Sequence, residues 1–106
     1  MEAAKPLVLV VDDRDDLLRF CERSLGDTYA FRLAGGARAA GDVLRDAEVA
    51  AVLLDRDFSR AAPDDLLGPP GEARDEGLVI LRWLRHEHPR LPVLMVTGFR
   101  DLETAL

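Results

Sequence analysis

The chain has 106 residues, a mass of 11.7 kDa and a formal net charge of −6. This length holds one domain, and a hydrophobic fraction of 48% is enough for a compact core. The acidic balance argues against direct binding of nucleic acid or of an anionic membrane, and we expect neither a membrane span nor a signal peptide.

Alternating strand and helix patterns follow one another along the chain. Four apolar runs predict strands at 7–11, 29–33, 50–54 and 93–96. Three amphipathic stretches predict helices at 13–25, 37–47 and 77–88, and Asp101 is expected to begin a last helix. The single cysteine, Cys21, lies on the apolar side of the first helix, so we expect a packed thiol in a reducing cytoplasm.

This order of elements predicts an α/β fold with a doubly wound parallel sheet in three α/β/α layers. Continuous apolar runs are typical of strands that are buried on both faces, and helical crossovers join parallel strands. One segment interrupts the alternation: residues 56–76 are rich in proline and glycine and form a loop of unusual length. A tolerated flexible insertion is one interpretation. The other is a lid or docking segment that uses Leu66 and Leu67 as its apolar contact.

Residues able to do phosphate chemistry stand at the carboxyl ends of three predicted strands. Asp12 and Asp13 follow the first, Asp55 follows the third, and Thr97 follows the fourth. Parallel strands bring these ends to one edge of the sheet, where open α/β folds bind ligands. Carboxylate oxygens suit Mg²⁺ or Mn²⁺, and a threonine hydroxyl can donate to a phosphoryl oxygen. Each acid taken alone could be a helix cap or a turn residue. Together they predict a site.

The ordered set of Asp12-Asp13, Asp55, Gly77 and Val96-Thr97-Gly98 resembles the receiver domain of two-component response regulators. The resemblance covers residues 1–106 and implies a flavodoxin-like (CheY-like) fold with strand order 2-1-3-4. It implies that Asp55 accepts a phosphoryl group from a sensor histidine kinase. Asp12, Asp13, Asp55 and the backbone carbonyl of Asp57 would bind Mg²⁺, and Thr97 would contact the phosphoryl group and act as the switch.

The chain departs from this family at the carboxyl end. The family has a fifth strand followed by a lysine, and this chain has no such strand and only Lys5, which precedes the first strand. We therefore expect that the chain is a piece of a longer protein. The alternatives are that the receiver is naturally short, or that a partner supplies the missing elements. The segment after Thr97 resembles receivers that precede an output module in transcriptional activators. A bare fourth strand would favour a homodimer through edge pairing or element exchange.

Two other functions compete with the phosphoacceptor receiver. Asp55-Arg56-Asp57 also resembles the nucleophile motif of haloacid-dehalogenase-like phosphohydrolases, with Asp55 as nucleophile and Asp57 as acid/base. That family places its nucleophile after the first strand, however, and the motif leaves Asp12 and Asp13 unexplained. The missing lysine favours instead a phosphorylation-independent interaction module. We expect a regulatory domain rather than an enzyme.

Overall fold

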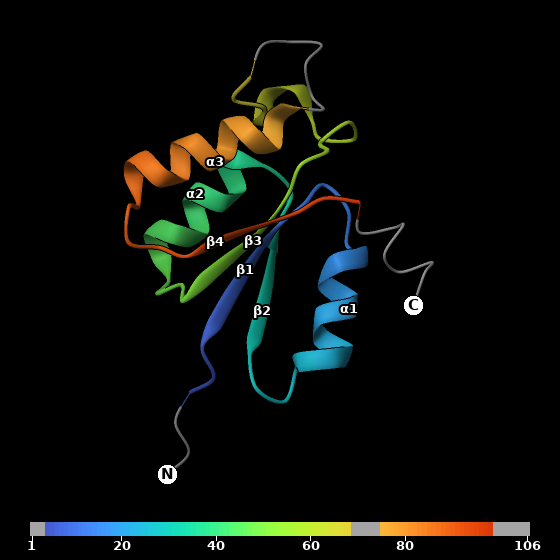
Figure 1. Cartoon of the computed structure of the whole chain (residues 1–106), viewed down its shortest axis with the longest axis vertical. Helices are drawn as coiled ribbons and strands as arrows, with labels where there is room; N and C mark the ends of the chain where they lie inside the picture. Colours follow the sequence, from blue (N-terminus) through green and yellow to red (C-terminus); the bar gives the residue numbers. More distant parts are fainter. Residues whose placement is uncertain (1–3, 69–74, 99–106) are drawn as a thin grey trace.

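The structure is a computed structural model that describes residues 4–68 and 75–98 (Figure 1). Its elements follow in the order β1 (Leu7–Val11), α1 (Asp16–Leu25), β2 (Ala30–Ala34), α2 (Ala37–Asp46), β3 (Ala51–Asp55), the 3₁₀ turn η1 (Pro63–Asp65), α3 (Glu76–Glu87) and β4 (Val93–Val96). The last helix predicted to begin at Asp101 lies outside the described residues. In the described part, no helix is both long enough and apolar enough to cross a bilayer.

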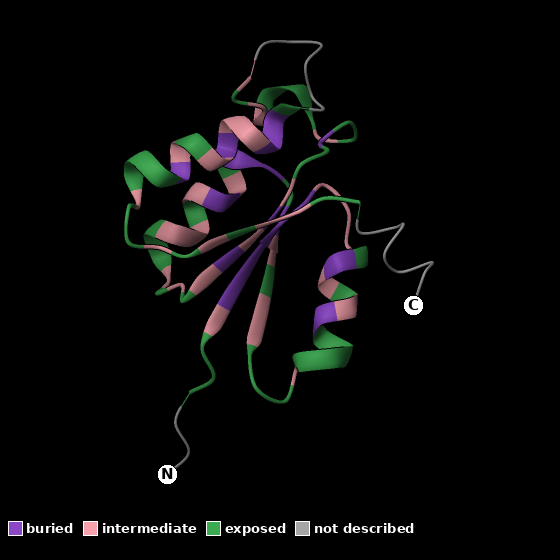
Figure 2. Ribbon diagram, in the orientation of Figure 1, coloured by how far each residue is buried: buried purple, intermediate pink, exposed green. Residues whose placement is uncertain are grey.

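The four strands form one parallel sheet in the order β2-β1-β3-β4, as predicted. In Figure 1, α1 covers one face of the sheet while α2 and α3 cover the other, which gives three layers. The central strands β1 and β3 are the most buried elements, and the helices are exposed on their outer sides (Figure 2). The predicted flavodoxin-like architecture is confirmed.

Two apolar clusters hold the layers together, one on each face of the sheet. The smaller cluster joins Val10 of β1 to Leu17 and Cys21 of α1, so Cys21 is the packed thiol that the sequence predicts. The larger lies under α2 and α3 and includes Leu9, Leu54, Ile80 and Leu84 among its buried side chains. Trp83 packs at the margin of this larger cluster.

Several predicted boundaries were wrong by one to three residues. The first helix begins at Asp16 rather than at residue 13, because the Asp12 side chain accepts a hydrogen bond from the Arg14 N–H (3.0 Å) and so favours a turn there. The second strand runs from Ala30 to Ala34, and Arg32 within it is exposed. The second helix ends at Asp46 and the third spans Glu76–Glu87.

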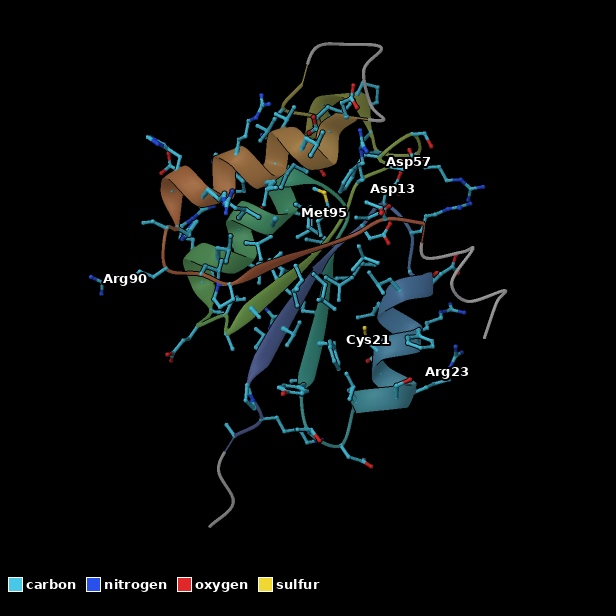
Figure 3. All side chains as sticks on the ribbon, viewed as in Figure 1. Asp13, Cys21, Arg23, Asp57, Arg90 and Met95 are labelled. Carbon is cyan, nitrogen blue, oxygen red and sulfur yellow. The ribbon has the colours of Figure 1, made fainter. Side chains whose placement is uncertain are left out.

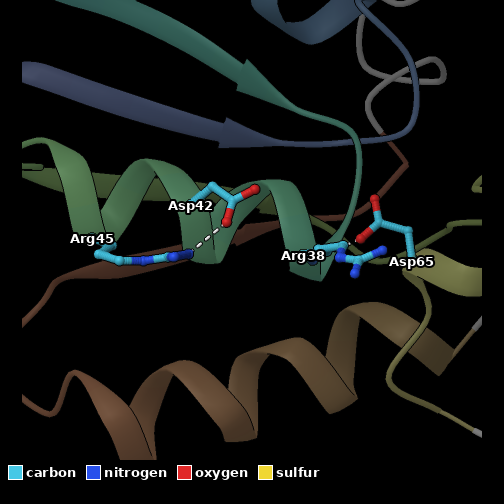
Figure 4. A network of polar contacts seen from close by, with 4 residues as sticks. All are labelled: Arg38, Asp42, Arg45 and Asp65. Atoms are coloured by element: carbon cyan, nitrogen blue, oxygen red, sulfur yellow. Dashed lines mark hydrogen bonds and ion pairs between the residues drawn. The ribbon is translucent and has the colours of Figure 1, made fainter.

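The described part of the predicted loop, residues 56–68, is docked against the domain at several points. Phe58 is completely buried in the larger cluster, and Leu66 packs at its margin. Leu67 is 49% exposed. The Asp65 carboxylate accepts the N–H of Arg38 (2.6 Å) in the first turn of α2 (Figure 4). Because α2 has no side-chain cap of its own, Asp65 acts as its N-terminal cap from a distant segment.

A buried carboxylate holds the same segment to the start of α3. Glu76 is 1% exposed, and its two oxygens accept the N–H groups of Leu67 (2.5 Å) and Gly68 (2.6 Å). The backbone donors of the loop are thus paired with a side chain of the helix that follows it. This arrangement places the loop beside the carboxyl ends of the strands.

Candidate functional site

The carboxyl ends of β1, β3 and β4 bring the predicted site residues to one edge of the sheet. Asp55 is the last residue of β3 and pairs in register with Val96 of β4, so Thr97 lies one residue beyond it. Asp12 and Asp13 directly follow β1, the strand on the other side of β3. Carboxylate oxygens of Asp12, Asp13 and Asp55 all lie within 4.8 Å of one another. The predicted convergence of these three acids is therefore observed.

Asp12 is the most buried of the three acids, with an exposure of 5%. Burial, with a further contribution from the charge of Asp55, raises the pKa of its carboxyl from 3.8 to about 8. The hydrogen bond from the Arg14 N–H opposes this rise but does not cancel it. Without a cation, burial therefore favours the protonated form of Asp12.

Asp55 is half-buried, and burial also raises the pKa of its carboxyl. Hydrogen bonds from the backbone of Arg56 and Asp57 and from the Asp12 side chain oppose the rise, while the charge of Asp13 adds to it. The cost of placing negative charge at this edge is thus shared between Asp12 and Asp55. A cation bound by both carboxylates would stabilise their ionised forms and so remove that cost.

The chemistry of this donor set fits a hard divalent cation. All three groups offer carboxylate oxygen, and exposed pockets on either side of them leave room for water ligands. Among the residues that the structure describes, no sulfur or imidazole ligand belongs to the cluster. Mg²⁺ and Mn²⁺ are the ions that match such a set.

The Asp13 carboxylate is bound by the loop that follows β3, a contact that the sequence did not predict. One of its carboxylate oxygens accepts the N–H of Arg60 (2.6 Å), which belongs to the docked loop segment. In Figure 3, Asp13 and Asp57 lie at the same end of the sheet, whereas Arg90 lies at the far end. The segment 56–68 therefore forms part of the wall of the site.

Asp55 and Thr97 line one open pocket of about 380 Å³, together with Arg56, Asp57, Asp75 and Gly98. A second pocket of about 400 Å³ lies on the Asp12 and Asp13 side and includes Arg14 and Arg60 in its lining. Asp57 is exposed, and its carboxylate accepts the N–H of Ser59 (2.9 Å). Thr97 is exposed and faces the pocket that a group on Asp55 would enter.

Gly77 permits α3 to begin directly against the end of β3. A Cβ at this position would overlap the carbonyl oxygen of Asp55 and the backbone of Arg56. The Gly77 N–H also donates to the Arg56 carbonyl oxygen (3.1 Å). This close approach explains why a glycine is needed at the start of the helix.

Lys5 lies at the other end of the sheet, as its place in the sequence predicts. It precedes β1, and its Nζ donates to the carbonyl oxygen of Gly26 (2.8 Å) in the turn after α1. It has no part in the acidic cluster.

Sequence reasoning missed three features of the site. They are the buried Glu76, the N–H of Arg60 that contacts Asp13, and Arg56 in the lining of the pocket of Asp55. A charged residue beside Gly77 was a signal for Glu76, since a glutamate at the first turn of a buried helix requires a partner. The Arg60 contact has no comparable signal, because it depends on the path of the loop.

Comparison with known proteins gives a consistent result. No protein-family model matches the chain. It is 31% identical over 98 residues to the response regulator protein PilR of Pseudomonas aeruginosa, an alignment that covers 92% of this chain and 19% of PilR. The chain thus spans about a fifth of the length of this curated relative.

Solved structures show the same likeness. The receiver domain of NtrX from Brucella abortus superimposes with a TM-score of 0.68 at 31% identity, covering 92% of this chain and 72% of that one. A longer structure of NtrX gives a TM-score of 0.69 at 29% identity, covering 96% of this chain and 21% of that one. A response regulator from Thermotoga maritima (TM-score 0.68, 22% identity, 95% and 75% covered) is similar in fold.

Proposed function

We propose that this chain, which belongs to the receiver-domain family of response regulators, accepts a phosphoryl group from a sensor histidine kinase on Asp55. The observation that carries the proposal is the convergence of Asp12, Asp13 and Asp55 within 4.8 Å at the edge where Thr97 faces the same pocket as Asp55. A scatter of surface acids would not place a hydroxyl donor beside a half-buried carboxylate. The domain is regulatory, and phosphorylation of Asp55 would switch it from one state to the other.

In this reaction an oxygen of the Asp55 carboxylate attacks phosphorus as the P–N bond of the kinase phosphohistidine breaks. The imidazole nitrogen keeps the bonding electron pair and takes up a proton, and an acyl phosphate forms on Asp55. Asp12, Asp13, Asp55 and the carbonyl of Asp57 would hold Mg²⁺, with Mn²⁺ as a substitute. When bound, Mg²⁺ would neutralise the carboxylates and the incoming phosphoryl oxygens.

Thr97 is proposed to read the phosphoryl group. Its hydroxyl can donate a hydrogen bond to a phosphoryl oxygen, and its position one residue beyond β4 places it in the lining of the pocket. A shift of Thr97 toward the phosphoryl group would change the surface that follows β4. That surface would carry the signal.

The test is incubation with a small phosphodonor, acetyl phosphate, and Mg²⁺, followed by intact mass measurement. We expect a gain of one phosphoryl group that is lost in Asp55→Asn and retained in Asp57→Asn. A chain that gains nothing under these conditions contradicts the proposal and favours a phosphorylation-independent module. Multiple turnovers of a small phosphate ester, lost in Asp57→Asn, would instead support the phosphohydrolase.

We further propose that the chain acts in the cytoplasm with a sensor kinase and an output domain in a longer protein, as a regulator of transcription. Among the described strands, β4 forms one edge of the sheet, which supports self-association by edge pairing. Sedimentation at tens of micromolar checks this. A monomer would contradict the dimer without affecting the phosphoacceptor role.

A further inference from the structure

Arg56 is the one cationic side chain that lines the pocket of Asp55 among the described residues. The other side chains of that pocket include the carboxylates of Asp55, Asp57 and Asp75 and the hydroxyl of Thr97. Arg14 and Arg60 line the second pocket, on the Asp12 and Asp13 side of the cluster. A dianionic group built on Asp55 would therefore enter a space where, among the described side chains, Arg56 supplies the positive charge in addition to any bound cation.

The backbone of Arg56 is fixed next to the acceptor. It follows Asp55 directly, and its carbonyl oxygen accepts the N–H of Gly77 (3.1 Å) at the start of α3. The close approach of Gly77 leaves no room for a side chain between helix and strand. The Arg56 side chain therefore starts from a constrained point and needs only rotamer changes to reach a group on Asp55.

The present partner of Arg56 is weakly held. Its guanidinium lies 3.5 Å from the carboxylate of Asp75, and the two side chains are 50% and 60% exposed. Ion pairs with this exposure contribute little stability and are readily exchanged. A phosphoryl group offers two or three oxygens and about twice the charge of a carboxylate, and its bidentate bonds with arginine are among the stronger polar contacts.

We propose that Arg56 binds the phosphoryl oxygens on Asp55, and that Asp75 competes with them for the guanidinium in the unmodified domain. The inference rests on the proposed function, because it assigns a ligand to the pocket of Asp55. On phosphorylation Arg56 leaves Asp75, which is the residue that precedes α3. The start of α3 thus reports the state of Asp55.

The test measures the affinity of the full chain for beryllofluoride, a phosphoryl mimic, in saturating Mg²⁺ by ¹⁹F NMR. Arg56→Gln should weaken binding by roughly tenfold or more, because the charged hydrogen bonds from the guanidinium to the phosphoryl mimic are lost. Arg56→Lys keeps the charge but loses the planar fork, and should fall between the two. Arg90→Gln is the matched control, because it removes the same charge at the far end of the sheet (Figure 3).

Asp75→Asn gives a prediction of the opposite sign. It frees the guanidinium from its competitor, so beryllofluoride should bind more tightly than to the unaltered chain. A merely structural role of the Arg56–Asp75 pair predicts weaker binding for both Arg56→Gln and Asp75→Asn. Far-ultraviolet circular dichroism establishes that each variant is folded before its affinity is compared.

The outcomes separate this inference from the proposed function. No beryllofluoride binding by the unaltered chain, together with no phosphoryl gain from acetyl phosphate, contradicts the phosphoacceptor role itself. Binding by the unaltered chain with an affinity that Arg56→Gln changes less than twofold overturns the role of Arg56. Weaker binding by Asp75→Asn overturns the competition. If Arg56→Gln does not fold, Arg56→Lys and the shift of the Arg56 guanidinium NMR signal on adding beryllofluoride decide the question.

Discussion

Asp12 shows how strongly a single position depends on its surroundings. The same residue type at Asp13 is half-buried and takes a hydrogen bond from the loop, whereas Asp12 is buried beside Asp55. Its pKa rises to about 8 for that reason. The site is therefore costly in the absence of a cation, which gives it a measurable dependence on pH.

Stability without divalent ions should fall as pH rises. The folded pKa of Asp12, about 8, lies above its unfolded value near 3.8, so the native state binds the proton more tightly. The resulting stability is fully present below pH 4 and is lost as pH rises toward 8, with a slope of at most about 1.4 kcal/mol per pH unit. The raised pKa of Asp55 acts in the same direction.

Urea unfolding in chelator at pH 5 and pH 8 measures this slope. Asp12→Asn should flatten it, because asparagine has no proton to lose. Equal slopes in the two proteins would show that Asp12 is not protonated in the native state.

Gly77 gives a second prediction at this scale. Gly77→Ala should destabilise the fold by about 1–3 kcal/mol, because its Cβ would overlap the Asp55 and Arg56 backbone. Gly41→Ala in α2 is the matched control: its Cβ would meet ring carbons of Trp83 at 3.6 and 3.8 Å, an ordinary contact. Helix propensity then favours alanine by up to about 1 kcal/mol. Thermal unfolding that ranks the two variants in the reverse order would contradict this packing.

The site residues could be predicted from sequence to different degrees. Asp12, Asp13, Asp55 and Thr97 each follow a strongly apolar run, so the direction of the chain alone places them at one edge. The same reasoning does not predict that the pKa of Asp12 is raised. That depends on how deeply each carboxylate lies, which is a property of packing.

At the scale of elements, residues 56–68 depart most from what the length of the loop suggests. A long loop is often free of the domain, yet this segment buries Phe58, caps α2 through Asp65 and is held by Glu76. Its N–H at Arg60 contacts Asp13. The segment therefore links the acidic cluster to the starts of α2 and α3.

Glu76→Gln tests this link. Glutamine has one acceptor oxygen, so at least one of the N–H groups of Leu67 and Gly68 loses its partner, at a cost of about 1–3 kcal/mol. We expect faster amide exchange at Leu67 and Gly68 in the variant. Glu87→Gln, at the exposed end of α3, is the control. Unchanged exchange in Glu76→Gln would show that the carboxylate does not hold the loop.

The strands and helices were predictable because their apolar periodicity is strong, and the errors lie at their ends. Asp13 was assigned to the helix, but the Asp12 side chain turns the chain before α1 can begin. The path of residues 56–68 could not be predicted. It depends on contacts between Asp65 and α2 and between Glu76 and the loop, which join residues far apart or in different elements.

At the scale of the whole molecule, the sheet brings three separate strand ends together into one cation site with a pocket on either side. The cost of ionising the acids should therefore appear as a dependence of global stability on divalent ions. If Mg²⁺ binds the native acids and not the unfolded chain, a Mg²⁺ concentration of about a hundred times the dissociation constant should stabilise folding by about 2.7 kcal/mol. Asp13→Asn should lose most of this gain, and Asp46→Asn, at the end of α2, should keep it. A Mg²⁺ effect of the same size in both variants would indicate nonspecific screening.

The convergence of Asp12, Asp13 and Asp55 is the claim on which the proposed function depends, and paramagnetic broadening by Mn²⁺ tests it most directly. With Mn²⁺ well below the protein concentration, we expect selective loss of the amide signals at 11–13 and 55–57, and Mg²⁺ should restore them together. Broadening that follows other acids, such as Asp42 and Asp46, or that affects only one of the two strand ends, would contradict a shared site.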